Sequence, residues 1–217
     1  MLYRVHKKLG FTIVELIVVI AMIGILAAIG IVMFNGVQDR AYNLERLNEM
    51  KGWENIFTIY AAQEKKYPSV PALGGYCLGS GFPTKTQIDD EFSSWGSPPA
   101  ASARWSPAET ANPAEGYCRN IMSYGSGNWQ ARHAVNTSLN TQLSSVGKLP
   151  SNQQFGGDYD WMVTPYVTYQ GTNSVIISQA FIGTTCPKTT TPVGPAGTNL
   201  MLCQITLSPR YSFDITP

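Results

Sequence analysis

The fold of this chain is decided close to its start, where residues 11–34 read FTIVELIVVIAMIGILAAIGIVMF. Glu15 is the one ionisable residue in this stretch. At about 1.5 Å per residue, an α-helix of this length measures about 36 Å, which is enough to cross the roughly 30 Å hydrocarbon core of a bilayer. The stretch therefore predicts a membrane-spanning helix over residues 11–34.

The ten residues before this helix predict its orientation. They contain Arg4, Lys7 and Lys8 and no acidic residue, so we expect a cytoplasmic N-terminus and a chain that lies outside the cytoplasm after Phe34. A secretory signal peptide is disfavoured, because its apolar region is about 7 to 15 residues long and ends at a small-residue cleavage site. A plain membrane anchor accounts for everything except Glu15, since a carboxylate in a membrane needs a partner or a function.

The composition of the 217-residue chain excludes several classes of protein. Charged residues make up 13%, about half the usual share, and 15 Lys and Arg nearly balance 14 Asp and Glu. This balance gives no basis for a polyanion-binding surface. The chain has no phosphate-binding loop, nucleophile elbow or dinucleotide-binding motif, so we expect no enzymatic activity. With two histidines and no Cys-x-x-Cys pair, we also expect no metal and no cofactor.

The residues Gly10–Leu16, GFTIVEL, resemble the processing motif of type IV prepilins and related pseudopilins. The resemblance covers about the first 60 residues. It implies that residues 1–10 are a leader, that a prepilin peptidase cuts between Gly10 and Phe11, and that the new N-terminal Phe11 is N-methylated. It also implies that Glu15, the fifth residue after the cut, is the carboxylate of the motif.

The same resemblance implies a function, partners and a location. The chain would be a type IV pilus subunit supporting adhesion, twitching motility or DNA uptake. Its partners would be other copies of itself or related pilins in a helical filament, the peptidase and methylase, and an inner-membrane assembly platform with its ATPase. It would be a single-pass protein of the lipid bilayer before assembly and part of an extracellular filament afterwards. Two alternatives stay open: a pseudopilin of a type II secretion or competence system, and a minor tip pilin that binds a surface, glycan or DNA.

A charge argument supports a role for Glu15 in assembly. Cleavage would create an ammonium on Phe11, one helical turn from Glu15. If subunits stack with an axial stagger, Glu15 of one subunit can meet the Phe11 amine of a neighbour, and each charge offsets the desolvation cost of the other. The chain has no proline before Pro68, where the family commonly has one earlier, so Gly24 and Gly30 are the candidates for a softened stretch. They could equally be small packing residues.

The helical pattern continues to about residue 66, so we predict one helix over residues 11–66, apolar over 11–34 and amphipathic over 35–66. One face carries Val37, Ala41 and Leu44, and the opposite face carries Met50, Trp53, Phe57 and Tyr60. We expect the first face to contact other subunits and the second to pack on the chain's own globular part. A kink near Gly52 with a single core face is the alternative.

The rest of the chain predicts a globular lobe in two parts. Residues 67–157 form an insertion with short helices over 86–95 and 134–146. Residues 158–217 form an antiparallel sheet, with strands over 159–169, 174–182 and 199–207 and a candidate fourth over 211–215. The expected class is α+β, a long helix packed on a small antiparallel sheet, and this order agrees with the ladle architecture of pilins.

All four cysteines follow the predicted span and so lie where disulfides persist. Four cysteines allow three pairings. We favour Cys186 with Cys203 and Cys77 with Cys118. The first pair would close a loop, Thr185–Gln204, that resembles the C-terminal disulfide loop of pilins.

Two further patterns in the lobe suggest ligands. Aromatic residues and arginines mix in the insertion, a mixture that could bind DNA or glycan. They are Trp95, Arg104, Trp105, Tyr117, Arg119, Tyr124, Trp129 and Arg132. An aromatic core is the alternative, and a processed chain with 12 basic and 14 acidic residues, net −2, disfavours general DNA capture. Asp158, Asp160 and Asp214 could bind calcium, although turn or cap roles are favoured.

Overall fold

The computed structural model describes residues 12–82, 84, 86–87, 90, 116–123, 128–150, 165–171, 173–197, 200–207 and 210–215. For residues 30–35, 119–123, 128–132 and 196–197 it describes the backbone alone. The chain divides into two compact units, Met1–Tyr42 and Asn43–Pro217, which are treated separately below. The element order is that of an α+β protein, as predicted.

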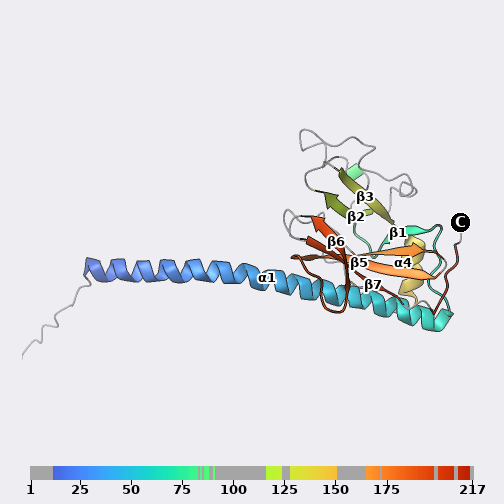
Figure 1. Ribbon diagram of the computed structural model, residues 1–217, viewed down its shortest axis with the longest axis horizontal. Helices are drawn as coiled ribbons and strands as arrows, with labels where there is room; N and C mark the ends of the chain where they lie inside the picture. Colours follow the sequence, from blue (N-terminus) through green and yellow to red (C-terminus); the bar gives the residue numbers. More distant parts are fainter. Residues whose placement is uncertain are drawn as a thin grey trace, which may run out of the picture. The chain divides into compact units, whose positions relative to one another are not determined.

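Helix α1, Ile13–Glu64, is continuous over 52 residues and passes through Gly52 without interruption (Figure 1). It begins after Thr12 and ends at Lys65, which has a left-handed φ of 60° and donates its N–H to the carbonyl of Ala61. A left-handed residue at this position is a common way to end a helix. Within the part of the chain that the structure describes, no helix is both long and apolar enough to cross a membrane.

The second unit begins with the C-terminal part of α1, which packs on the sheet through one apolar face. Met50, Trp53, Phe57 and Tyr60 are all buried, as predicted, and Ile56 and Ala61 are buried with them. Their spacing of three and four residues places them on one side of the helix. They share a core with Leu139, Leu143, Val167, Val175, Ile177, Phe181 and Ile205. This half of α1 is therefore an integral part of the lobe.

A seven-stranded sheet lies against that helix, with the strand order β2-β3-β1-β4-β5-β7-β6. The strands are β1 Gly74–Cys77, β2 Tyr117–Ser123, β3 Asn128–Val135, β4 Tyr166–Gln170, β5 Ser174–Ile182, β6 Thr191–Gly197 and β7 Leu200–Thr206. All neighbours pair antiparallel except β1 and β3, which are parallel. The short helix α4, Thr137–Ser144, follows β3 and buries Leu139 and Leu143. The sheet is thus mostly antiparallel.

Three predicted strands correspond to β4, β5 and β7, and other predictions need correction. Residues 134–135 end β3 rather than beginning a helix, because α4 starts after its N-cap residue Asn136. Of the predicted strand 211–215, Ile215 alone forms a bridge, to Val70. The strands β1, β2, β3 and β6 were not predicted. Most of the predicted helix 86–95, and residues 159–164 of the first predicted strand, lie outside the described residues.

The two outer strands of the sheet, β2 and β6, lie near each other. The sheet is therefore curled. A second core fills the curled side and contains Cys77, Phe82, Cys118, Val135, Tyr166, Ala180, Leu200 and Leu202. The outer strand β6 contains Pro192 and Pro195, and its register with β7 shifts just after each of them. The sheet therefore has apolar packing on both faces.

Two disulfides cross-link the lobe. Cys77 bonds to Cys118 and Cys186 bonds to Cys203, the two pairings favoured from the sequence. The first joins β1 to β2, which are separated in the sheet by β3. The second joins the loop after β5 to β7 and encloses β6. All four cysteines of the chain are therefore oxidised.

The C-terminal segment folds back onto the end of α1. Tyr67 donates its backbone N–H to Ser212, and Val70 donates to Asp214. Lys66 Nζ lies 2.7 Å from Asp214 Oδ2. Phe213 is buried against Tyr169, with ring centroids 4.8 Å apart. The tail is thus tied to the chain directly after α1.

Candidate functional site

The start of α1 is stabilised by reciprocal hydrogen bonds between Thr12 and Glu15. The backbone N–H and the hydroxyl of Thr12 each donate to Glu15 Oε2 at 2.8 Å. In return, the backbone N–H of Glu15 donates to Thr12 Oγ1 at 3.2 Å. This is a capping box, in which the N-cap residue and the third helical residue satisfy each other's backbone donors. The carboxylate is therefore held at the start of the helix.

The capping role of Glu15 was not predicted from the sequence, which assigned that carboxylate to assembly. The signal was present, because threonine followed three residues later by glutamate, ahead of an apolar run, is the sequence pattern of a capping box. A carboxylate in the first turn also interacts favourably with the helix dipole. Glu15 thus has a local structural reason to be where it is.

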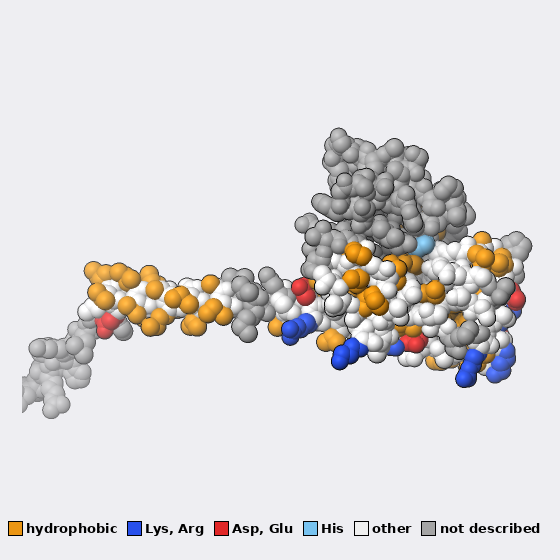
Figure 2. Space-filling view, in the orientation of Figure 1, with side chains coloured by type: hydrophobic (Ala, Val, Ile, Leu, Met, Phe, Trp, Pro, Cys, Tyr) orange, Lys and Arg blue, Asp and Glu red, His pale blue; other side chains and the backbone are white. Residues whose placement is uncertain are grey.

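The first part of α1, residues 13–29, exposes an apolar surface on all sides. Large hydrophobic side chains between Ile13 and Ile29 are between 46% and 78% exposed. They are Ile13, Val14, Leu16, Ile17, Val18, Val19, Ile20, Met22, Ile23, Ile25, Leu26 and Ile29. Figure 2 shows hydrophobic side chains along this part of α1. Soluble monomers rarely expose a continuous apolar surface of this kind, so the segment requires lipid or protein partners.

The other predicted assembly residues have different outcomes. Gly10 and Phe11 lie outside the described residues. Gly24 and Gly30 are both helical, and a Cβ added at Gly24 would meet nothing within 4 Å. Helix α1 continues through both positions, and their flexibility stays a prediction.

The face of α1 that was predicted to meet other subunits is exposed in the single chain. Val37 is 61% exposed and Leu44 is 62% exposed, and Ala41 is exposed between them. Contact of this face with a neighbouring subunit stays a prediction.

The predicted ligand sites in the lobe fare differently. Tyr117 is 1% exposed and belongs to the interior, so it does not form part of a surface patch. The other side chains of the aromatic and arginine patch lie outside the described residues, as do Asp158 and Asp160. Asp214 forms an ion pair with Lys66. No cluster of metal-ligating side chains occurs among the residues that the structure describes.

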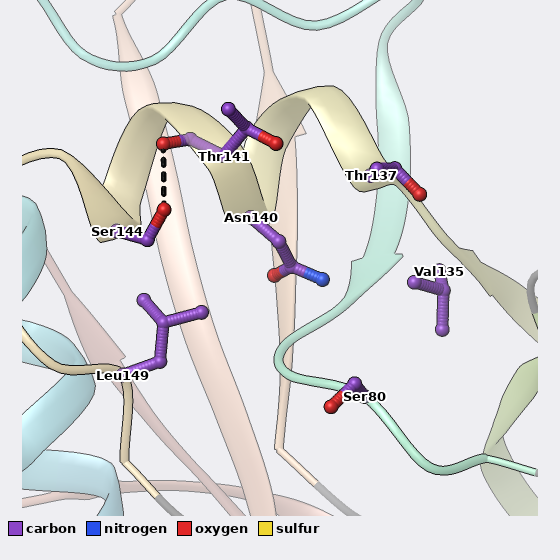
Figure 3. Close-up of a pocket in the computed structure, with 7 residues that line it drawn as sticks. All are labelled: Ser80, Val135, Thr137, Asn140, Thr141, Ser144 and Leu149. Carbon is purple, nitrogen blue, oxygen red and sulfur yellow. Dashed lines mark hydrogen bonds between the residues drawn. The ribbon is translucent and has the colours of Figure 1, made fainter.

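A shallow groove of about 340 Å³ runs beside α4 (Figure 3). Its lining mixes hydroxyl, amide and aliphatic groups from Ser80, Val135, Thr137, Asn140, Thr141, Ser144 and Leu149. Asn140 exchanges two hydrogen bonds with the backbone of Gly79, and Ser144 donates to the carbonyl of Thr141. The described lining carries no ionisable side chain, and its amide is engaged in holding the loop after β1.

Comparison with known proteins places the recognisable part of the chain at its start. Residues 5–31 match the family model of the prokaryotic N-terminal methylation motif. No curated protein and no solved structure matches the chain. The match includes Gly10, Phe11 and Glu15 and the apolar beginning of α1.

Proposed function

We propose that this chain, whose start carries the methylation signature of type IV pilins and pseudopilins, is a structural subunit that polymerises through α1 into a filament. The observation that carries the proposal is the apolar surface of residues 13–29, exposed on all sides of a helix whose first turn holds Glu15. Such a surface is suited to a bilayer before assembly and to a bundle of like helices afterwards.

Processing would prepare the helix for assembly. We propose cleavage after Gly10 by a prepilin peptidase and N-methylation of Phe11. Removal of the leader takes away Arg4, Lys7 and Lys8 and places a new ammonium next to Thr12. Methylation of an amine keeps its positive charge, so the modified terminus can still pair with a carboxylate.

Capping of the helix and pairing with a neighbour are compatible at Glu15. Both bonds from Thr12 reach the same oxygen, Oε2. A carboxylate has two oxygens and about four acceptor sites, so it can take further donors. In the proposed filament, Glu15 of one subunit accepts the Phe11 ammonium of the next, and Val37, Ala41 and Leu44 contact neighbouring helices. Assembly then removes an unpaired charge from an apolar environment.

Among filament types, we propose a surface pilus with roles in adhesion, twitching motility or DNA uptake. Cleavage leaves 207 residues, 217 less the ten of the leader, and this is bulky for the repeating subunit of a short pseudopilus. Before assembly the chain would be a single-pass membrane protein, supplied to an inner-membrane platform with its ATPase. Abundant surface filaments containing this chain would support the pilus, whereas a few copies at a tip would indicate a minor adhesin.

Three substitutions separate charge from capping in the full chain. Glu15→Gln keeps an acceptor for Thr12 but removes the charge, Glu15→Val removes both, and Thr12→Ala removes the hydroxyl cap but keeps the charge. We expect both Glu15 variants to be cleaved and methylated normally but to lose most filaments, and Thr12→Ala to retain filaments. The measurements are the intact mass of membrane-extracted protein and the yield of filaments sheared from cells.

The outcomes distinguish the alternatives. Wild-type filament yield from Glu15→Gln would contradict the charge-pairing role. A wild-type chain that still begins at Met1 would contradict the processing pathway altogether and leave a membrane-anchored lobe.

A further inference from the structure

Strand β5 is longer than the strand that pairs with one of its edges. Among the described residues, β4 begins at Tyr166, which lies opposite Ser178, whereas β5 continues to Ile182. On its other edge, β5 pairs with β7 as far as Ile182 opposite Leu200. Alternate residues of an antiparallel strand direct their backbone groups to the same side. The backbone groups of Ala180 and Ile182 therefore face the same side as β4, beyond the pairing of Ser178 with Tyr166.

Side chains of α1 bond to the backbone of β5 at that edge. Asn43 donates from Nδ2 to the Ile182 carbonyl at 2.7 Å and accepts the Ile182 N–H at Oδ1, 2.8 Å away. Arg46 donates from Nη1 to the Ala180 carbonyl at 3.3 Å. One turn further on, Glu49 Oε2 accepts a hydrogen bond from Nε2 of Gln179 at 2.8 Å. We call Asn43, Arg46 and Glu49 the polar ladder.

The polar ladder is buried. Arg46 is 2% exposed, Glu49 is 6% exposed and Gln179 is fully buried. Burial lowers the pKa of the Arg46 guanidinium to about 9, against the opposite effect of Glu49 and Glu45, so Arg46 stays charged at neutral pH. Gln179 Oε1 has no hydrogen-bond partner among the described residues. Buried ionic and partly satisfied polar groups are poor sources of stability, and apolar replacements of similar size are often as stable or more stable.

The ladder offers specificity that the apolar face lacks. The buried face from Met50 to Ala61 contacts the sheet through side chains, and apolar contacts are not directional. Such a face could settle one turn higher or lower, a shift of about 5.4 Å along the helix. The ladder contacts are directional and involve two named backbone groups of Ile182 and one of Ala180. A shift of one turn would break all of them at once.

We propose that the polar ladder is a register lock, which fixes the height of the lobe's own part of α1, from Asn43 onward, against β5. In a filament built through the helix, that height would set where each lobe lies relative to the next. The lock itself is a property of the single chain, so its test does not depend on filament formation.

The test measures a distance in the full processed chain in detergent micelles. Spin labels are placed on cysteines introduced by Asn55→Cys on α1 and Gln170→Cys on β4, both exposed, and all native cysteines are in disulfides. The ladder and its partner Gln179 are made apolar by Asn43→Leu, Arg46→Met, Glu49→Met and Gln179→Met together. We expect one distance population in the parent, and in the apolar variant a second population displaced by about one helical turn, about 5.4 Å, with no decrease in the urea midpoint.

A matched control and a second variant keep the test decisive. Ile56→Ala, on the same helix face, should lower the midpoint yet keep the single distance, because it leaves the ladder intact. If the fourfold variant does not fold, Asn43→Leu with Arg46→Met decides by the same criterion, since it removes every bond from the ladder to the backbone of Ala180 and Ile182. A single unchanged distance in a folded ladder variant would overturn the register lock and leave the proposed filament role untouched.

Discussion

Gly75 in β1 shows how tightly one residue of the lobe can be constrained. A Cβ built on Gly75 would overlap the imidazole ring of His133, which lies in β3 beside the Tyr166 ring. His133 is 7% exposed, so the groups around it leave its imidazole ring little room to move. Glycine is therefore required here by close approach of a neighbouring side chain, and a larger residue must displace the ring.

We expect Gly75→Ala to lower the free energy of unfolding by about 1–3 kcal/mol through overpacking. Urea unfolding of the full chain in detergent measures the loss. The matched background is His133→Ala, which removes the ring. In that background Gly75→Ala should cost much less, and equal costs in both backgrounds would show that the ring is not the obstacle.

The ion pair between Lys66 and Asp214 attaches the C-terminal segment to the end of α1 in a pH-dependent way. The hydrogen bond to Asp214, and then the charge of that carboxylate, raise the pKa of Lys66. A lysine whose pKa is higher in the folded state contributes stability that is complete below its unfolded pKa of about 10.4 and is lost as the pH rises through the folded pKa. The contribution is therefore present at neutral pH and absent in strong alkali.

We expect Lys66→Met to lower the unfolding midpoint slightly at neutral pH, with a difference from wild type that shrinks once the pH exceeds about 10.4. Added salt should shrink the difference as well, because both side chains are exposed. Lys188→Met, at another exposed lysine, is the control and should leave the midpoint at neutral pH nearly unchanged. A Lys66→Met difference that stays constant into strong alkali would rule out the ion pair as its source.

At the scale of elements, the two faces of α1 differ in what they contribute. Ile56 is 8% exposed and packs in the core of the lobe, whereas Ile59, three residues later, is 43% exposed. We expect Ile56→Ala to cost about 2–5 kcal/mol of unfolding free energy, because it leaves a cavity. Ile59→Ala should cost under about 1 kcal/mol, since it lies at the surface. Similar costs at the two positions would contradict the assignment of the faces.

The elements that could be predicted are those whose residues alone determine them. Helix α1 has a long run of helix formers without proline, and β5, SVIISQAFI, is rich in β-branched and apolar residues. In contrast, β1 reads GGYC and β6 reads TPVGPAG, compositions typical of turns. These two are strands because β4 and β7 pair with them. Their structure depends on tertiary neighbours and is not encoded locally.

The candidate site was predictable for a related reason. Gly10, Phe11 and Glu15 lie within a few residues of one another, so a short motif contains them all. The capping bond between Thr12 and Glu15 is equally local and could have been read from the sequence. The polar ladder could not, since Asn43 and Ile182 are 139 residues apart in the sequence and meet only when α1 packs on β5.

At the scale of the whole molecule, the disulfides cross-link a lobe of modest size. The Cys77–Cys118 link spans 41 residues and the Cys186–Cys203 link spans 17. On the chain-entropy model, loops of these lengths predict losses of about 4 and about 3 kcal/mol when each pair is replaced by alanine. Urea unfolding of the Cys77→Ala/Cys118→Ala and Cys186→Ala/Cys203→Ala variants measures both losses. A larger loss from the shorter loop would indicate that packing, rather than chain entropy, dominates.

The prolines of β6 have a consequence for the way in which the lobes of the proposed filament subunits can meet. The last strand of a sheet normally offers its backbone to any extended chain, and this is a common start of off-pathway aggregation. Pro192 and Pro195 have no N–H to offer, and both lie exposed in the outermost strand. A second lobe cannot extend the sheet there with a regular ladder. In the proposed filament, contacts between subunits would therefore be made by the helices and not by strand pairing at this edge.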